Sequence, residues 1–362
     1  MDIKALIVNA GIRFDYFEPD GKIPTDFRDP DPHNPIKQRE VWFKRAKPKI
    51  QFSPRFGLAF PITERGVFHA SYGHFFQIPN FEYLYVNSEF EIPPQSYVTL
   101  GNADLKPQKT VIYEVGLQQQ LTENLAVSLT AYAKDIRNLL GTELHELYIV
   151  VDRYARYINR DYGFVRGFTI ALKKRPSHNV SATVDYTFQI AKGNASDPNA
   201  VFLDNQAIPP IEPEKQMVPL DWDRTHSLNM TVTIGDPKGW NLSLIGKFGS
   251  GFPYTAEYKG FRFPENAHRK PDTYSFDLYA YKNFQIFGLR YSLFMKVYNL
   301  FDRRNELTVY GDTGRATTNL EPQYRVHRAT GTKSLYSLEE CYTRPDFYSE
   351  PRRVILGISI EF

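Results

Sequence analysis

Residues 110–136 contain two neighbouring segments in which apolar and polar side chains alternate at every second position. The apolar positions of the first are Val111, Tyr113, Val115 and Leu117, and those of the second are Leu125, Val127, Leu129, Ala131 and Ala133. A period of two over this length is typical of an extended strand with one apolar and one polar face. Residues 122–124 leave room only for a tight antiparallel hairpin. Each segment has the roughly ten residues that a tilted strand needs to cross a bilayer.

The same alternation recurs along the whole chain. It predicts twelve strands, at about 4–17, 54–60, 68–76, 110–120, 125–136, 167–172, 180–189, 227–234, 240–248, 274–280, 289–297 and 353–362. We therefore expect an all-β protein, an antiparallel up-and-down transmembrane β-barrel of about twelve strands. In such a barrel the apolar positions face lipid, for example Val111, Val127, Val184 and Leu293.

The connections between these segments alternate between short and long. Short ones lie near residues 61–66, 122–124, 175–179, 235–239 and 283–288, and long ones span about 18–47, 78–108, 138–161, 191–224, 252–271 and 303–350. A soluble β-sandwich has no reason to sort its loops by side. Short turns at one end and long loops at the other are typical of bacterial outer-membrane barrels, whose turns are periplasmic and whose loops are extracellular.

Composition excludes several other classes of protein. No stretch approaches the roughly 18 consecutive apolar residues of a transmembrane helix. The net charge of +3 is small and scattered, so we expect no nucleic-acid partner. The single Cys341 excludes an intrachain disulfide and offers no metal-site spacing. The first residues lack the features of a signal peptide, so we expect either a chain that is not exported or the C-terminal piece of something longer.

A search for catalytic and metal-binding residues finds no set that converges. His69 and His74 lie at positions of opposite parity in one strand and have no partner at ligand spacing. The segment 221–223, with Asp221 and Asp223, and the pair His226 and Ser227 offer an acid, a base and a nucleophile, but adjacent residues of a strand point to opposite faces. We therefore expect a protein that is not an enzyme, with no catalytic, cofactor-binding or metal-binding residues.

Charged residues also occur at the polar positions of the strands. They are Arg13, Asp15, Arg55, Glu114, Lys134, Asp185, Lys247, Asp277, Arg290 and Lys296. Ionisable groups at membrane depth are tolerated only where they face water or one another. For most of them we expect a place on a water-filled inner wall.

Several segments, taken in order, resemble the barrels of TonB-dependent outer-membrane receptors. They are residues 53–58 (SPRFGL), 71–79 (SYGHFFQIP), 103–109 (ADLKPQK), 223–229 (DRTHSLN), 249–255 (GSGFPYT) and 297–302 (VYNLFD). The later segments are most similar to large receptors that carry a carboxypeptidase-regulatory-like extension. The terminal Phe362 resembles the aromatic end that the barrel assembly machinery reads.

The resemblance implies a receptor for TonB-dependent uptake across the bacterial outer membrane. Barrels of this family have twenty-two strands, with an N-terminal plug domain inside, whereas this sequence predicts about twelve strands and no plug. We therefore expect one domain, residues 1–362, that forms the C-terminal portion of such a barrel, without plug or signal peptide. The expected partners are outer-membrane lipid and the barrel assembly machinery, with the TonB system reached only through the missing plug.

Ligand contacts are expected in the long loops, because aromatic and polar loops on a rigid scaffold often bind ligands. The favoured loops are 78–108 and 303–350, although their side chains could equally pack among themselves. The transported nutrient, whether siderophore, corrinoid, glycan or peptide, is left open. The alternative is an independent twelve-strand outer-membrane porin or barrel hydrolase, which would need its own export signal and, for a hydrolase, a convergent catalytic set.

The resemblance also implies that the sheet does not close. The strand at 4–17 corresponds to an interior strand of the family's barrel, and the strand at 354–362 corresponds to its last strand. Neither finds its family partner in this chain, so each is an unpaired edge. We expect an open, curved, incomplete barrel.

Overall fold

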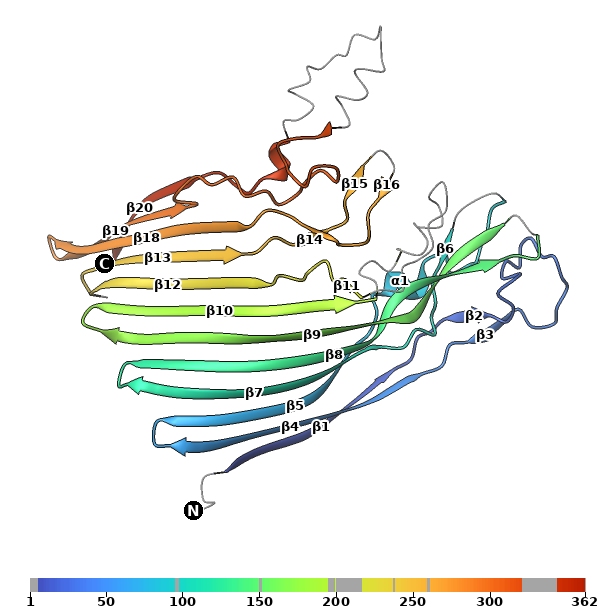
Figure 1. Ribbon diagram of the computed structural model, residues 1–362, viewed down its shortest axis with the longest axis horizontal. Coiled ribbons are helices and arrows are strands. Elements are labelled where there is room, and N and C mark those ends of the chain that lie inside the picture. The colour runs from blue at the N-terminus through green and yellow to red at the C-terminus, as the bar shows by residue number, and fades with distance from the viewer. Residues whose placement is uncertain are drawn as a thin grey trace, which may run out of the picture.

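The computed structural model describes residues 6–94, 98–149, 152–194, 199, 217–236, 238–258, 261–320 and 344–361. One large antiparallel sheet dominates it, with its strands side by side in nearly the order of the chain (Figure 1). Its strands are β1 (Ile7–Phe17), β4 (Lys49–Thr63), β5 (Gly66–Gln77), β7 (Gln108–Thr122), β8 (Leu125–Glu146), β9 (Arg153–Ser177), β10 (Val180–Gly193), β12 (His226–Asp236), β13 (Trp240–Gly249), β18 (Thr273–Ile286), β19 (Leu289–Tyr298) and β20 (Arg353–Glu361). Each of the twelve predicted strands is present, so the prediction of the fold class is confirmed.

Short elements gather beyond one end of these strands. They are β2 (Lys22–Pro24), β3 (Phe43–Arg45), α1 (Phe81–Tyr85), β6 (Thr99–Leu100), β11 (Val218–Pro219), β14 (Pro253–Tyr254), β15 (Glu257–Tyr258), β16 (Phe261–Arg262), β17 (His268–Arg269) and the 3-10 helix η1 (Pro345–Phe347). Two of them join the large sheet: β6 pairs in parallel with β9, and β11 pairs with β10. In the described part of the chain no helix is long and apolar enough to span a membrane.

The strand register gives the sheet one apolar and one polar face. Residues that pair directly across two strands share a face. One apolar row runs through Val127, Leu172, Val184 and Met230 on four successive strands. The adjacent row on the other face includes Asp185 and Asn229. Two-faced strands are therefore confirmed, and all ten charged residues predicted on the polar side share that face by register.

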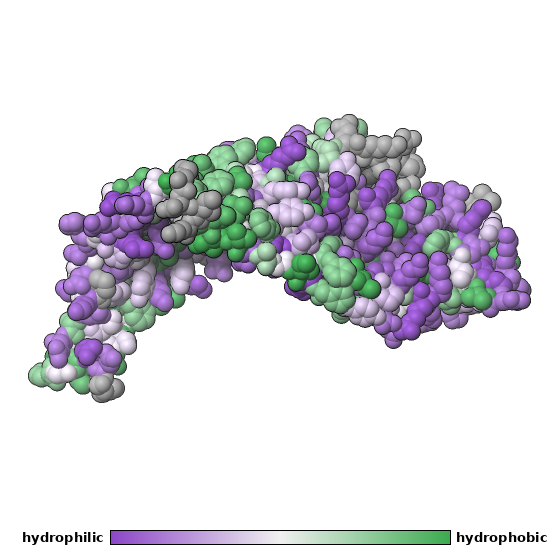
Figure 2. All heavy atoms as spheres, turned by 90° about the horizontal axis from the view of Figure 1, so that it is seen from below, coloured by the Kyte–Doolittle hydropathy of each residue, from purple (hydrophilic) through white to green (hydrophobic). Residues whose placement is uncertain are grey.

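The sheet is arched (Figure 2). Hydrophobic residues gather along much of its upper, convex outline in that view, and the loop-bearing end is mostly hydrophilic. Large apolar side chains on the apolar face remain exposed, among them Ile12 at 76% and Leu356 at 69%. A face of this kind needs an apolar environment to cover it.

Short turns and long connections lie at opposite ends of the strands (Figure 1). The five short turns, which follow β4, β7, β9, β12 and β18, fall where the sequence predicts them. The prediction of a long connection at 138–161 is wrong. Strands β8 and β9 continue as a hairpin as far as Glu146 and Arg153, because their pairing persists through register shifts around Leu139. Asn138, with φ of 60°, lies at this irregularity, which breaks the period of two without ending the strands.

The sheet is open, with β1 and β20 at its two edges. No pairing joins these two strands among the described residues. The expected open, curved sheet is therefore confirmed. Phe362, Cys341 and the middle of the long connection 303–350 lie outside the described residues.

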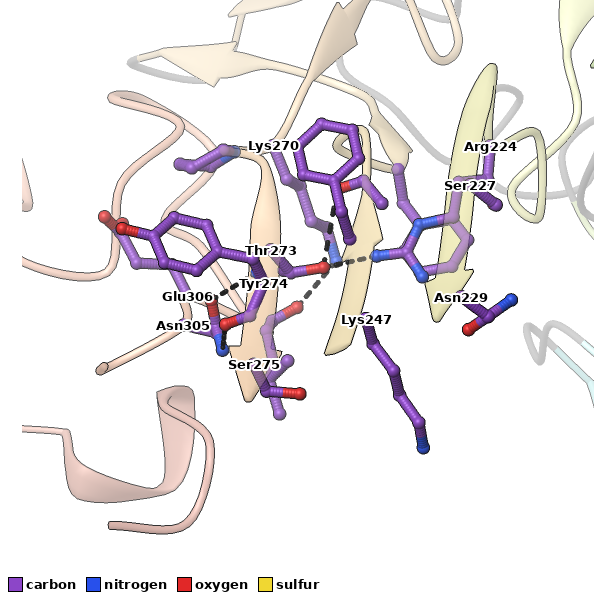
Figure 3. Close-up of a pocket in the computed structure, with 15 residues that line it drawn as sticks. Arg224, Ser227, Asn229, Lys247, Lys270, Thr273, Tyr274, Ser275, Asn305 and Glu306 are labelled. Atoms are coloured by element: carbon purple, nitrogen blue, oxygen red, sulfur yellow. Dashed lines mark hydrogen bonds between the residues drawn. The ribbon is translucent and has the colours of Figure 1, made fainter. Parts of the chain in front are cut away.

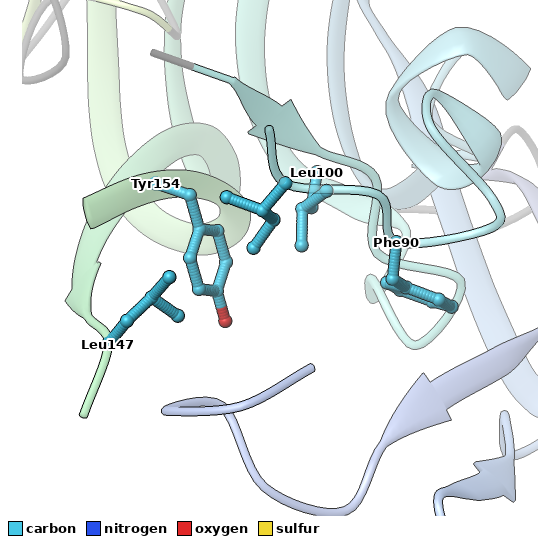
Figure 4. Packing of buried hydrophobic residues seen from close by; sticks show 5 residues of the cluster. Phe90, Leu100, Leu147 and Tyr154 are labelled. Atoms are coloured by element: carbon cyan, nitrogen blue, oxygen red, sulfur yellow. The ribbon is translucent and has the colours of Figure 1, made fainter. Parts of the chain in front are cut away.

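The buried hydrophobic clusters lie at the loop-bearing end, where connections pack against the extended β8–β9 hairpin. One cluster contains Phe90, Ile92, Leu100, Leu147 and Tyr154 (Figure 4). Its Tyr154 is fully buried, and the Tyr154 hydroxyl donates a hydrogen bond of 2.8 Å to the carbonyl oxygen of Phe27. Loop 78–108 contributes Phe90, Ile92 and Leu100 to this packing, and packing of this kind was the alternative to ligand binding left open from its sequence.

Candidate functional site

A cavity of about 420 Å³ opens at the loop-bearing ends of β12, β13 and β18 (Figure 3). Its walls are formed by Arg224, Ser227, Asn229, Lys247, Phe248, Gly249, Phe252, Lys270, Pro271, Thr273, Tyr274, Ser275, Asn305, Glu306 and Leu307. This volume lies within the usual range of small-molecule sites, roughly 300–1,000 Å³. The cavity therefore has room for a small ligand or for one group of a larger ligand.

Three strands each contribute one polar side chain to the floor of the cavity. Asn229 pairs with Lys247, and Lys247 pairs with Ser275, so the three side chains form one row on the polar face. Lys247 is exposed, and no ion pair to it is found among the described residues. A strand scaffold holds such side chains more firmly than a loop does.

Arg224 lies across the next polar row, made of Ser227, Gly249 and Thr273. Its Nε donates to the carbonyl oxygen of Ser250 at 3.1 Å, its Nη2 donates to the Thr273 hydroxyl, and its guanidinium lies 4.6 Å from the centre of the Phe252 ring. Burial lowers the pKa of Arg224, an effect that Asp272 opposes. An arginine remains charged in a protein even so.

Two glycines make room for this arrangement. A Cβ added at Gly249 would overlap the Arg224 guanidinium, and one added at Gly251 would overlap the backbone carbonyl of Lys270. The motif 249–255 therefore supplies space for the motif 223–229. The two segments also exchange hydrogen bonds, since the backbone N–H of His226 donates to the Ser250 hydroxyl at 3.0 Å.

Asp223 anchors the chain just before Arg224. It is 1% exposed, accepts a hydrogen bond of 2.7 Å from the backbone N–H of Ala191, and forms an ion pair with Arg269. The Arg269 guanidinium also donates to the carbonyl oxygen of Gly251 at 3.2 Å. Asp223 is therefore committed to a structural role that links β10, β12 and the connection after β13.

Glu306 is the carboxylate among the lining residues. Three hydrogen bonds from the Arg315 guanidinium and one from the backbone N–H of Ala316 reach its two oxygens. Burial alone would raise the pKa of Glu306, but the hydrogen bonds from Arg315 and Ala316 outweigh it and hold the pKa below its ordinary value. Next to Glu306 along the chain, the carbonyl oxygen of Leu307 accepts a hydrogen bond of 3.1 Å from Lys270 Nζ.

The motif 297–302 fixes both ends of the connection that carries Glu306. The side-chain amide of Asn299 donates to the carbonyl oxygens of Arg303 at 2.9 Å and Glu350 at 3.0 Å. The Asp302 carboxylate accepts from the backbone N–H of Arg352 at 2.8 Å. Both residues have φ near 50°, a conformation that Asn and Asp tolerate.

Among the described residues of the two favoured loops, those that line the cavity belong to 303–350 and are Asn305, Glu306 and Leu307. The remaining walls come from 224–229, 247–252 and 270–275, which the sequence did not indicate as ligand contacts. The sequence feature that could have indicated these walls was the pair of motifs at 223–229 and 249–255. Their resemblance to receptor segments identified the family, but it could not tell which side chains share a cavity.

The residues weighed as a catalytic set do not meet. His226 pairs with Phe188 on the apolar face, where His226 Nδ1 and the Tyr186 hydroxyl lie 2.9 Å apart. Ser227 pairs with Thr187 on the other face, which confirms the prediction that these neighbours point in opposite directions. His74 Nε2 lies 2.5 Å from the Tyr72 hydroxyl. Within the described ranges, no three His, Cys, Asp or Glu side chains are grouped as metal ligands.

Comparison with solved structures finds chains of the same fold. The outer-membrane transporter YddB from Escherichia coli has a TM-score of 0.54 at 13% identity, covering 71% of this chain and 38% of that one. The siderophore receptor PiuA from Acinetobacter baumannii has a TM-score of 0.53 at 13% identity, covering 85% and 38%. The copper transporter OprC has a TM-score of 0.53 at 12% identity, covering 99% and 46%. The chain thus spans less than half the length of these structures.

Comparison with curated proteins gives no match. The family model described as "TonB dependent receptor-like, beta-barrel" matches residues 1–300. That family consists of transporters and not of enzymes, which agrees with the expected absence of catalysis. Because this match, to a model of the family's β-barrel, extends over most of the chain, the chain belongs to the TonB-dependent receptor family.

Proposed function

We propose that this chain is the barrel wall of an outer-membrane receptor for TonB-dependent uptake of a bulky nutrient. The observation that carries the proposal is the two-faced sheet, whose short turns all lie at one end and whose long connections lie at the other. An apolar face paired with a polar face is what a barrel needs to contact lipid on the outside and water inside. The family match supports the same function.

In this proposal residues 1–362 form one domain, the C-terminal portion of a larger barrel. The open edges β1 and β20 support this, because unpaired strand edges are too costly in hydrocarbon. The long connections are extracellular and the short turns periplasmic. Contact with the TonB system runs through a plug domain, and Phe362 serves the barrel assembly machinery.

The nutrient is left open among siderophores, corrinoids, glycans and peptides. The similar solved structures include a siderophore receptor and a copper transporter, but at 12–13% identity they support the fold and not a ligand. Competitive growth of cells with and without the protein in iron-, copper-, corrinoid-, glycan- or peptide-limited medium tests the uptake function. Loss of fitness in one medium is expected, and equal fitness in all of them contradicts uptake of any of these nutrients.

Cysteine labelling on intact cells tests location and orientation. Replacing Cys341, the only cysteine of the chain, by Ser provides a background without thiols in this chain. In that background a cysteine is introduced by Thr317→Cys or by Glu123→Cys. Thr317 is exposed in a long connection, and Glu123 is exposed in a short turn. A membrane-impermeant maleimide is expected to label position 317 in intact cells and position 123 only after the outer membrane is permeabilised. Labelling of position 123 in intact cells contradicts the proposed orientation.

A further inference from the structure

We propose that the cavity between β12, β13 and β18 binds an anionic solute that carries carboxylate or phosphate groups. The proposal rests on the proposed receptor function, because it names the chemical class of the ligand that the receptor contacts at this end. It follows from the charge of the lining residues, from the free donors that they offer, and from the way the strands hold them.

The lining residues carry an excess of positive charge. Three of them are cations, Arg224, Lys247 and Lys270, and one is a carboxylate, Glu306. Glu306 is 8% exposed and its oxygens are occupied by Arg315 and Ala316. Asp272 offsets part of the charge of Arg224 from outside the lining set. The cationic side chains of the cavity therefore face a ligand with their charge largely uncompensated.

The donors in the cavity remain available. The ammonium group of Lys270 has three protons and one described acceptor, the carbonyl oxygen of Leu307. Lys247 has no described ion pair, and it lies between two neutral polar residues, Asn229 and Ser275. A carboxylate or phosphate accepts several hydrogen bonds at once and matches such a group of donors.

One of the three cations, Arg224, is held in place by contacts within the protein. Arg224 is fixed by Ser250 and Thr273 and lies against the Phe252 ring. Gly249 leaves the space that the guanidinium occupies. A preorganised cation loses little conformational freedom on binding, so more of the electrostatic attraction contributes to affinity.

Calorimetric titration of the full chain in detergent tests the proposal, with citrate and inorganic phosphate as anionic probes and maltotriose as a neutral probe. We expect citrate or phosphate to bind, with an affinity that falls as salt is raised, and maltotriose to bind more weakly or not at all. Lys247→Gln and Lys270→Gln are each expected to weaken binding about three- to fivefold, and together more than tenfold. Lys296→Gln is the matched control, since Lys296 lies on the same face in β19 but outside the cavity.

A second pair of variants tests the geometry. Gly249→Ala is expected to displace Arg224 and to weaken binding severalfold, whereas Gly57→Ala adds a methyl group whose nearest neighbours are 3.9 Å away and is expected to have no effect. Absence of binding of both anions, equal affinities in the Lys247 and Lys296 variants, or binding of maltotriose as tight as that of citrate would overturn the proposal. Cell-surface labelling at position 317 is measured on the same variants. Normal labelling without anion binding rejects the anionic ligand alone and leaves the receptor function intact.

Discussion

Among single residues, the ion pair between Glu306 and Arg315 stabilises the connection that follows β19. The carboxylate is almost fully buried, while the Arg315 side chain is 56% exposed. The hydrogen bond that Arg315 donates to Glu306 raises the pKa of Arg315, and the pair holds the connection after β19 against the cavity. This interaction depends on the ionised form of the carboxylate.

We expect the contribution of Glu306 to stability to depend on pH. Since its folded-state pKa is lowered, the contribution is fully present above the unfolded-state pKa of about 4.3 and is lost as the pH falls through the folded-state value. Hydrogen exchange at the Ala316 amide, which donates to Glu306, measures this in the native protein and in Glu306→Gln at each pH. The variant should exchange faster at pH 7, and the difference should shrink toward pH 3. A difference that is the same at both pH values would refute the assignment.

Residue positions on the faces were predictable from the sequence, but long-range partners were not. Alternation places Lys247 and Asp185 on the polar face because a strand repeats every two residues. The hydrogen bond from Arg224 to Thr273 joins residues 49 positions apart. It depends on the path of the chain around Gly249, which no local pattern encodes.

Among the strands, the period of two in the sequence predicted where each strand lies, but it did not predict how long each strand is. Strands β8 and β9 have 22 and 25 residues because their outer halves pair through irregular register and pack under loops. Tyr154 and Tyr157, which lie in that outer half of β9, are buried. A strand buried on both faces has no reason to alternate apolar and polar residues, so the period of two is lost in this part of β9.

We expect Val184→Arg to destabilise the inserted sheet by about 2–4 kcal/mol, and Thr183→Arg by far less. Val184 lies on the apolar face four residues after the start of β10 at Val180. With a rise of about 3.3 Å per residue and a tilt near 40°, this is roughly 10 Å from the turn, near the middle of an apolar band about 25 Å tall. Guanidinium titration in phospholipid vesicles measures the difference. Equal tolerance of arginine at both positions would contradict the assignment of Val184 to a lipid-facing side and Thr183 to a polar side.

In the whole molecule, the sheet and its loops differ in where their side chains are buried. The turn-bearing half of the sheet has few fully buried side chains, because neither face of it is covered by another layer of this chain. The buried clusters instead lie where the connections pack against one another. Strand twist curves the sheet into an arch. Its edges are open because β1 and β20 do not pair with each other among the described residues. The open sheet was predictable from the family resemblance, since neither edge strand was expected to meet its partner within this chain.

We expect the two edges to remain apart in the membrane-inserted protein. In a Cys341→Ser background, the pair Ala10→Cys and Leu356→Cys should form no disulfide, because Ala10 pairs with Phe56 on β4 and Leu356 with Met295 on β19. The control pair Ala10→Cys and Phe56→Cys shares one position and joins register partners, so oxidation should cross-link it readily when the Cβ atoms are about 3.5–4.5 Å apart. Mobility on non-reducing gels measures both. Cross-linking of positions 10 and 356 as efficient as in the control would mean that the twelve strands close into a barrel of their own, with the register and shear that such a small closure requires.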